Sequence, residues 1–167
     1  MLELGGGTGL VGITCPLAGA EKMVVADFPY EQILDNIQQN VDRNIFARWQ
    51  QRWDSSVAIE GHKLGDIEDG FADANAYTFQ RVIAAGCLWL PDQHENLAYS
   101  LTHFLAEEKE EEVGLMSSIF LGRKGLAGFF DIARCRGMQV REMFEHDALE
   151  NKRPWGKSVN LRTNLSL

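Results

Sequence analysis

The chain has 167 residues, of which 45% are hydrophobic and 24% charged, a composition typical of one globular domain large enough to bury a core. Its formal net charge of -8 argues against a general nucleic-acid binder, which needs a basic face, and no run of about 18 apolar residues indicates a membrane span. The three cysteines lie far apart and in no metal-ligand spacing, so we expect a reduced compartment, the cytoplasm, and no metal site.

The first predicted element is a buried strand that ends at Leu4 and continues into a glycine-rich turn. Four of the five residues 5–9 are Gly, which adopts positive φ readily and lets a ligand approach the backbone closely. If a helix begins directly after the turn, its first amides point at that ligand. Only residues 1–4 precede the turn, whereas a central strand usually has about five or six residues, so we expect a truncated first strand in a single domain, residues 1–167, that is N-terminally incomplete.

The glycine turn satisfies two ligand patterns. Residues 7–12 read G-x-G-x-x-G, and Asp27 follows twenty residues after the first Gly, as in a dinucleotide site. From Glu3 the same stretch reads E-x-G-x-G-x-G. A carboxylate there repels a pyrophosphate but suits S-adenosyl-L-methionine, which carries a sulfonium and an ammonium group and no phosphate. Glu3 therefore favours the methyl donor, with an NAD-dependent oxidoreductase and a glycine turn without a ligand as the alternatives.

Helical and strand-like patterns alternate along the rest of the chain. Apolar residues at helical spacing predict helices over residues 10–18, 29–44, 92–105 and 125–134. Apolar or alternating runs predict strands over residues 23–26, 56–59, 79–86, 113–120, 138–144 and 158–165. Residues 62–75 and the acidic run 107–112 are typical of polar loops. This order predicts an α/β fold with a doubly wound, mostly parallel sheet and an antiparallel strand near the C-terminus.

Several blocks of the chain resemble one family. They are residues 3–9, 24–29, 36–44, 87–97, 121–123 and 129–130. Together they resemble the seven-strand S-adenosylmethionine-dependent methyltransferases, and among these the fungal nicotinamide N-methyltransferase-like branch, relatives of the eukaryotic protein lysine methyltransferases. The resemblance covers nearly the whole chain and implies a Rossmann-like methyltransferase fold. It also implies methyl transfer to a protein amine, either a lysine side chain or an N-terminal amine, and members of this branch are associated with methylating elongation factor 1-alpha.

The resemblance also assigns contacts with the methionine and ribose parts of the donor. Gly5, Gly6 and Gly7 match the positions that line the methionine part. Asp27, at the end of the second predicted strand, matches the residue that accepts hydrogen bonds from both ribose hydroxyls. The alternative role of Asp27 is that of an N-cap for the helix expected to begin at Pro29.

The remaining assignments concern the adenine, the sulfonium and the acceptor amine. Leu64 and Asp66 would lie near the adenine, although Leu64 stands where the family usually has Trp. Ala85 would back the sulfonium, and Glu3 would lie near the amino group of the donor unless it is a solvated carboxylate at a strand end. Trp89 would form one wall of a slot for the acceptor amine, with core packing as the alternative.

The chain departs from the family pattern at Gly86, where relatives carry an Asp. Relatives also have an upstream segment that helps to cover the donor, and this sequence begins too late to include it. The alternative function is therefore a catalytically impaired or truncated relative that acts as a binding module. Methyl transfer needs a neutral amine, and an α-amine with a pKa of about 7.7 loses its proton more easily than a lysine with a pKa of about 10.4. Without the acid, we expect an N-terminal amine to be the less demanding acceptor.

Other residues with reactive side chains receive no catalytic role. His94 is either a base or a capping or surface residue, and Cys87 is expected to be an inert, protonated thiol because it follows an apolar strand. His62, His103 and His146 are isolated in the sequence and form no metal-ligand set.

Overall fold

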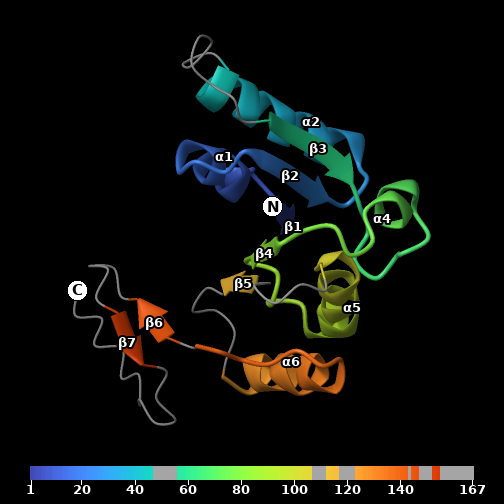
Figure 1. The fold of residues 1–167 in the computed structure, drawn as a ribbon, viewed down its shortest axis with the longest axis vertical. Coiled ribbons are helices and arrows are strands. Elements are labelled where there is room, and N and C mark those ends of the chain that lie inside the picture. Colours follow the sequence, from blue (N-terminus) through green and yellow to red (C-terminus); the bar gives the residue numbers. More distant parts are fainter. Residues whose placement is uncertain (47–55, 107–111, 117–122, 143, 147–151, 155–167) are drawn as a thin grey trace, which may run out of the picture.

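The computed structural model describes residues 1–46, 56–106, 112–116, 123–142, 144–146 and 152–154. Five parallel strands form its central sheet in the order β3-β2-β1-β4-β5 (Figure 1). They are β1 (Leu2–Leu4), β2 (Lys22–Asp27), β3 (Ser56–Gly61), β4 (Arg81–Ala85) and β5 (Glu112–Met116). β1 lies between β2 and β4, so the order of the strands reverses beside it. In open α/β sheets, ligands bind at this switch point, outside the carboxyl ends of the strands.

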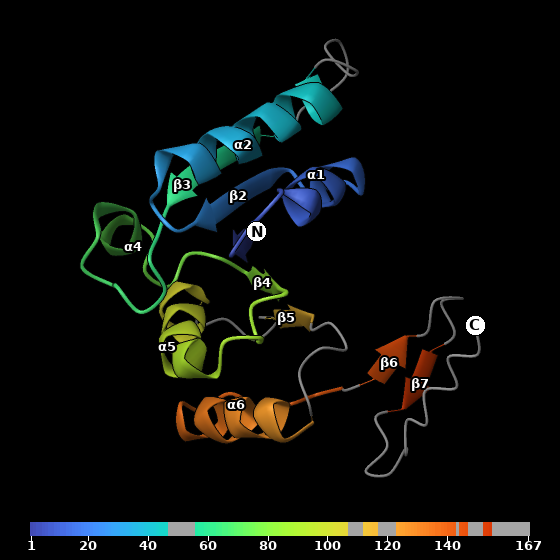
Figure 2. The ribbon, with the colours of Figure 1, turned by 180° about the vertical axis from the view of Figure 1, so that it is seen from behind.

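Helices cover both faces of the central sheet (Figures 1 and 2). On one face lie α1 (Leu10–Leu17) and α2 (Glu31–Val41), and α2 continues into a π-helical turn, η1 (Asp42–Phe46). On the other face lie α4 (Gly70–Ala74), α5 (His94–Phe104), which follows the 3-10 turn η2 (Pro91–Gln93), and α6 (Arg123–Cys135). The predicted α/β, doubly wound architecture is confirmed.

The strands distribute their side chains between two hydrophobic clusters. Leu2 and Leu4 are both 0% exposed and pack in the cluster that contains α5 and α6. Met23 and Val25 of β2 pack in the other cluster, with α1 and α2. Successive residues of a strand point to opposite faces, so Glu3 is directed to the α1 face. A carboxyl group is thus buried in the middle of the sheet.

The long helices and the buried strands follow the predictions closely. Predicted helices over residues 10–18, 92–105 and 125–134 are confirmed as α1, η2 with α5, and α6. Helix α2 begins at Glu31, two residues later than predicted, because Tyr30 is its N-cap and Pro29 packs beside Gly61. Its predicted end at Asn44 falls inside the π-helical turn.

Two of the predicted elements differ from the structure, a polar loop and a strand. Residues 62–75 contain a helix, α4, which has only five residues and therefore shows no helical periodicity, although Asp69 caps it. The strand predicted over residues 138–144 is wrong, because residues 138–142 belong to no strand and Val140 is 49% exposed.

The described antiparallel pairing lies outside the central sheet. β6 (Phe144–His146) pairs antiparallel with β7 (Lys152–Pro154) in a separate two-stranded sheet. Figures 1 and 2 place this pair beyond α6, away from the central sheet. The strand predicted over residues 158–165 lies outside the described residues, as do residues 107–111 of the acidic run and residues 117–120 of the strand predicted over residues 113–120.

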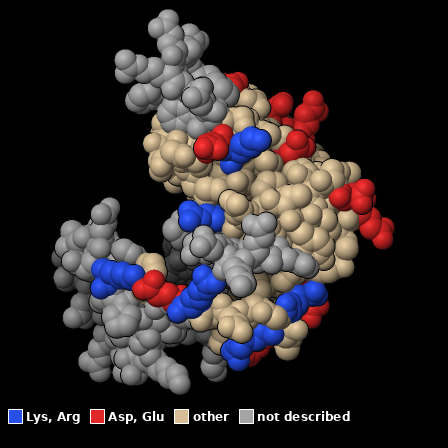
Figure 3. All heavy atoms as spheres, viewed as in Figure 1, with Lys and Arg blue, Asp and Glu red and all other residues tan. Residues whose placement is uncertain are grey.

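Charge is unevenly distributed over the face drawn in Figure 3. Asp and Glu side chains lie mainly over α2 and α4, whereas Lys and Arg lie mainly over α6 and the β6–β7 pair. Within the described part of the chain, no helix combines the length and the apolar composition needed to cross a membrane.

Candidate functional site

The glycine turn connects β1 to α1 and is held against the end of β2. The amides of Gly5 and Gly6 both donate to the carbonyl of Ala26, at 2.9 and 3.1 Å. Gly5 has a φ of 69°, and a Cβ on it would lie 2.5 Å from the Sγ of Cys87. A side chain at position 5 would therefore be strained and would also collide with the thiol. The turn can pass this close to β4 only because the residue is Gly.

Asp27 links the glycine turn to the end of β2. One carboxylate oxygen, Oδ2, accepts from the amide of Gly7 at 2.7 Å, and Oδ1 accepts from the amide of Phe28 at 2.6 Å. The proposed alternative role as an N-cap is wrong, since the N-cap of α2 is Tyr30 and no side chain caps that helix. A carboxylate oxygen has two lone pairs, so each oxygen of Asp27 retains one for a ligand hydroxyl.

A cavity of about 320 Å³ opens beside Asp27, at the carboxyl ends of β1 and β2. It is lined by Leu4, Gly5, Ala26, Asp27, Phe28, His62, Lys63, Leu64, Leu90 and Gln93. This volume is at the lower end of the range of about 300–1,000 Å³ found for small-molecule pockets. The cavity thus brings the predicted residues Gly5, Asp27 and Leu64 together at the switch point of the sheet.

Glu3 lies behind the glycine turn and is not one of the residues lining the cavity. Its side chain is buried, with 2% of the residue exposed, so the alternative of a solvated strand end is wrong. Oε2 accepts from the amide of Gly12, in the first turns of α1, at 2.8 Å. Burial raises the pKa of Glu3 to about 7, the Gly12 amide opposes this rise, and the nearby charge of Asp27 adds to it.

Ala85 ends β4 on the other side of the turn, and Gly86 follows it. The register that pairs Glu3 with Ile83 brings Ala85 level with Gly5. Gly86 has a φ of 71°, and a Cβ placed there would meet no heavy atom within 4 Å. Space for a side chain therefore exists where relatives carry an acid.

Cys87 is the inert thiol that the sequence predicts. Its Sγ donates to the carbonyl of Leu4 at 3.2 Å. Burial, together with the charges of Asp27 and Glu3, raises the pKa of Cys87 to about 11. The thiol is protonated near neutral pH and is a packing group under Gly5.

The loop after β4 presents Trp89 to solvent. Trp89 is 61% exposed, so the alternative of core packing is wrong, and its neighbour Leu90 lines the cavity. His94 is 3% exposed, and its Nε2 lies 2.9 Å from the carbonyl of Leu88. The surface position predicted as one alternative for His94 is wrong, because the ring is buried and holds this loop in place.

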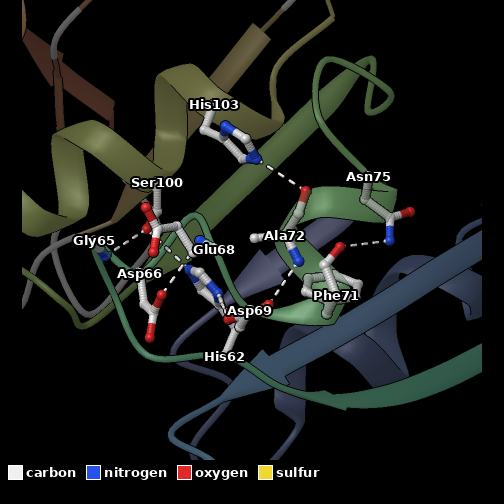
Figure 4. Close-up of polar contacts among 10 residues, drawn as sticks. All are labelled: His62, Gly65, Asp66, Glu68, Asp69, Phe71, Ala72, Asn75, Ser100 and His103. Atoms are coloured by element: carbon white, nitrogen blue, oxygen red, sulfur yellow. Dashed lines mark hydrogen bonds and ion pairs between the residues drawn. The ribbon is translucent and has the colours of Figure 1, made fainter.

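Asp66 does not line the cavity, although Leu64 does. Its Oδ1 accepts from the amide of Glu68 at 3.3 Å, and its own amide donates to the carbonyl of Lys63 at 2.9 Å. Asp66 therefore shapes the turn that follows Leu64. Figure 4 shows it on the loop that leads from β3 towards α4.

A polar network beside the cavity was missed by the sequence analysis. His62 Nδ1 lies 2.7 Å from Asp69 Oδ2, and His62 Nε2 lies 3.0 Å from Ser100 Oγ (Figure 4). His62 is thus not isolated, but no spacing in the sequence links it to a serine 38 residues away. The same three residue types form hydrolase triads, yet Ser100 is 0% exposed and out of reach of a substrate. His103 also has a partner, with Nε2 2.9 Å from the carbonyl of Ala72.

A metal centre has no support in this region. Among the described residues, no group of three or more His, Cys, Asp or Glu side chains could hold a metal ion.

Comparison with known proteins identifies the family. Residues 1–130 match the family model described as lysine methyltransferase. The chain belongs to this family. It is 42% identical over 69 residues to the protein N-terminal and lysine N-methyltransferase EFM7 of Cryptococcus neoformans, a match that covers 41% of this chain and 22% of that protein. It is 29% identical over 160 residues to the protein of the same name from Neurospora crassa, covering 87% of this chain and 54% of the relative.

The chain covers only part of its relatives, and its fold is similar to that of solved methyltransferases. This methyltransferase-family chain spans about half, or less, of the length of these curated relatives. Its fold is similar to that of an arsenic(III) S-adenosylmethionine methyltransferase from Chlamydomonas reinhardtii, with a TM-score of 0.60, 18% identity, and coverage of 88% of this chain and 56% of that one. A second similar structure is the CurJ carbon methyltransferase, with a TM-score of 0.50, 15% identity, and coverage of 78% and 32%. At such identities these structures support the Rossmann-like fold alone.

Proposed function

We propose that this chain binds S-adenosyl-L-methionine in the cavity beside Asp27 and transfers its methyl group to a protein amine. One observation carries the proposal. Asp27 fixes Gly7 through its carboxylate and lines the cavity at the switch point of the sheet, in a chain of the lysine methyltransferase family. A carboxylate at the end of the second strand is the group that binds a ribose in nucleotide-binding α/β folds.

The residues around the cavity suit the adenosine end of the donor. Phe28, Leu64 and Leu90 provide apolar walls, and Asp27 provides the acceptor for hydroxyl groups. Lys63 is the one lysine or arginine among the described lining residues. The carboxylate of Asp27 in the lining repels a pyrophosphate and favours a ligand without phosphate.

The chain contributes mainly positioning and exclusion of water to the reaction. The donor supplies a methyl group that is activated by its sulfonium. Gly5 has no side chain, so the methionine part can lie close to the backbone of the turn. Ala85, a small residue level with Gly5, leaves room for the sulfonium beside the end of β4. Trp89 provides an exposed aromatic face for a cationic or neutral amine.

Calorimetry separates the candidate ligands. We expect S-adenosylhomocysteine to bind with micromolar affinity and NAD to produce no heat. Removing the ribose acceptor in Asp27→Ala should weaken binding at least about hundredfold, because two charge-assisted hydrogen bonds are lost. The matched control is Asp35→Ala, which removes an exposed carboxylate from α2. Binding of NAD, or unchanged binding by Asp27→Ala, would contradict the proposed site.

We further propose elongation factor 1-alpha as the acceptor and the cytoplasm as the location. The names of the relatives support an N-terminal amine or a lysine as the acceptor group. Incubation with labelled donor and a cytosolic extract, followed by mapping of the labelled residue, tests the acceptor directly. Label on a different protein would overturn the elongation-factor assignment while leaving the reaction class intact.

Gly86 favours a second candidate function, a binding module with impaired catalysis. This residue leaves no carboxylate at the end of β4 to orient an incoming amine. The two functions differ in one measurement, since a module binds S-adenosylhomocysteine but transfers no label in the extract.

A further inference from the structure

The loop that forms the Leu64 wall of the cavity is tied to Ser100 of α5 by one buried and one half-buried hydrogen bond. We infer that Ser100 and Asp69, acting through His62 and Gly65, are positioning residues that hold this wall in the shape required to bind the donor. The inference rests on the proposed donor site. The sequence alone assigns no site role to Ser100 or Asp69.

His62 lines the cavity although only 3% of the residue is exposed. Asp69 engages its Nδ1 and Ser100 engages its Nε2, so neither ring nitrogen is available to a ligand. His62 therefore contributes the ring as a wall and does not contribute a hydrogen bond to the donor. Phe104 packs edge-on against the same ring, with centroids 4.9 Å apart.

The hydrogen bonds between Gly65, Ser100, His62 and Asp69 all run in one direction. The amide of Gly65 donates to Ser100 Oγ at 2.9 Å, which leaves the hydroxyl proton for His62 Nε2. Nδ1–H of His62 then donates to Asp69, whose other oxygen accepts from the amide of Ala72 at 2.6 Å. One neutral tautomer of His62 satisfies every group in this chain, and Figure 4 shows it running from the loop to α4.

The loop that contains Leu64 and Gly65 lies in close contact with α5. Gly65 has a φ of 85°, and a Cβ there would lie 2.6 Å from Oδ1 of Asn96. The backbone next to Leu64 is therefore fixed both by the hydroxyl of Ser100 and by the surface of α5. The half-buried amide of Gly65 and the buried ring nitrogen of His62 that lose Ser100 must find other partners, and they can do so only if the loop moves. Movement of the loop displaces Leu64 from the cavity.

The test is Ser100→Ala, with binding of S-adenosylhomocysteine measured by calorimetry. We expect about a tenfold weaker affinity, because the loop must be reordered when the ligand binds. Thr102→Ala is the matched control, since its hydroxyl bonds only to the carbonyls of Ala98 and Tyr99 in the same helix. Its affinity should equal that of the wild type. Wild-type affinity in folded Ser100→Ala would overturn the inference.

A second variant and a second measurement keep the inference separate from the donor site. Asp69→Asn retains an oxygen for the Ala72 amide but weakens the contact with His62, and we expect a smaller loss of affinity. In nuclear magnetic resonance spectra without ligand, Ser100→Ala should shift the amide signals of Leu64 and Gly65, and wild-type His62 should carry its proton on Nδ1. A wild-type chain that binds no S-adenosylhomocysteine refutes the proposed function. Unchanged amide signals, or a proton on Nε2, refute the positioning network.

Discussion

Glu3 is a carboxyl group whose environment changes its chemistry. It lies in the central strand, bonded to the amide of Gly12 and with its pKa raised to about 7. A cationic group bound near the glycine turn would favour the ionised form and lower this pKa. The residue that indicates a methyl donor in the sequence is therefore also sensitive to pH near neutrality.

The raised pKa of Glu3 makes stability depend on pH. Between pH 4.5 and about 7 the folded protein binds this proton more tightly than the unfolded chain, so the stabilisation from Glu3 is lost as pH rises through this window. The loss is up to about 3 kcal/mol. Glu3→Gln has no titrating group at this position and should not lose this stability. The free energy of unfolding of the variant minus that of the wild type should therefore increase from pH 4.5 to about 7.

Urea unfolding of both proteins at the two pH values measures this difference. The control is Glu21→Gln, which removes an exposed carboxyl group at the start of β2. The same pH response in wild type and Glu3→Gln would show that Glu3 does not retain its proton in the folded protein.

Restoring an acid at position 86 should change the choice of acceptor. Near pH 7, deprotonation costs a lysine about 4 to 5 kcal/mol and an α-amine about 1 kcal/mol, so lysine depends more on a group that orients it. Gly86→Asp fits the open space at this position, and Asp tolerates the positive φ better than most residues. We expect methylation of a lysine to increase relative to that of a free N-terminus.

Two peptides, one with a blocked N-terminus and one without lysine, allow the two rates to be compared. Gly137→Asp is the matched control, since Gly137 also has a positive φ, 84°, and open space around its Cβ position. An equal change on both peptides would contradict the role assigned to this carboxylate.

At the scale of elements, the contact between α1 and β2 sets the position of the glycine turn. Gly12 lies against Val25, and a Cβ on Gly12 would overlap Cγ2 of that residue and lie 3.4 Å from Oε2 of Glu3. The helix can therefore approach the sheet closely enough for its Gly12 amide to bind Glu3. The G-x-G-x-x-G pattern has a packing role in its last Gly, in addition to the ligand role of the turn.

Gly12→Ala should lower the free energy of unfolding by about 1 to 3 kcal/mol, because an extra methyl group must be fitted between α1 and β2. Gly70→Ala is the matched control, since its Cβ would meet nothing within 4 Å and its position is at the start of α4. Urea unfolding compares the variants. Equal stability of Gly12→Ala and wild type would show that α1 can move away from β2 without cost.

Long elements were predictable from the sequence because their patterns repeat. Helix α5 repeats its apolar spacing over several turns, and strand β2 contains a continuous apolar run. Each element lies where the sequence predicts it. Helix α4 and the pair β6–β7 are too short to produce a period, and they depend on contacts with other parts of the chain. Residues 138–142 alternate in polarity but pair with no strand in the part of the chain that the structure describes.

At the scale of the whole molecule, exposed apolar side chains lie on or beside the rim of the cavity. Phe28 and Leu90 line it and are 51% and 40% exposed, and Trp89 next to Leu90 is 61% exposed. They come from the ends of β2 and β4, on both sides of β1. Such groups at the mouth of the proposed donor site suit docking of a protein segment.

Trp89→Ala should therefore raise the KM for a protein acceptor about tenfold or more and leave the affinity for S-adenosylhomocysteine unchanged, because Trp89 does not line the cavity. Leu17→Ala is the matched control, as Leu17 is 44% exposed at the far end of α1. Steady-state kinetics and calorimetry measure the two effects. A loss of donor affinity without a change in KM would assign Trp89 to the donor site instead.

The sequence alone determined the fold class and the glycine turn, because both depend on local backbone chemistry and on side-chain periods that neighbouring residues carry. The roles proposed for Gly5 and Asp27 follow from the resemblance of the sequence to the methyltransferases. Only the tertiary structure decided the burial of Glu3, the exposure of Trp89 and the bond between His62 and Ser100. Burial and long-range hydrogen bonds depend on which elements pack together, and residues far apart in the chain carry no local sign of that packing.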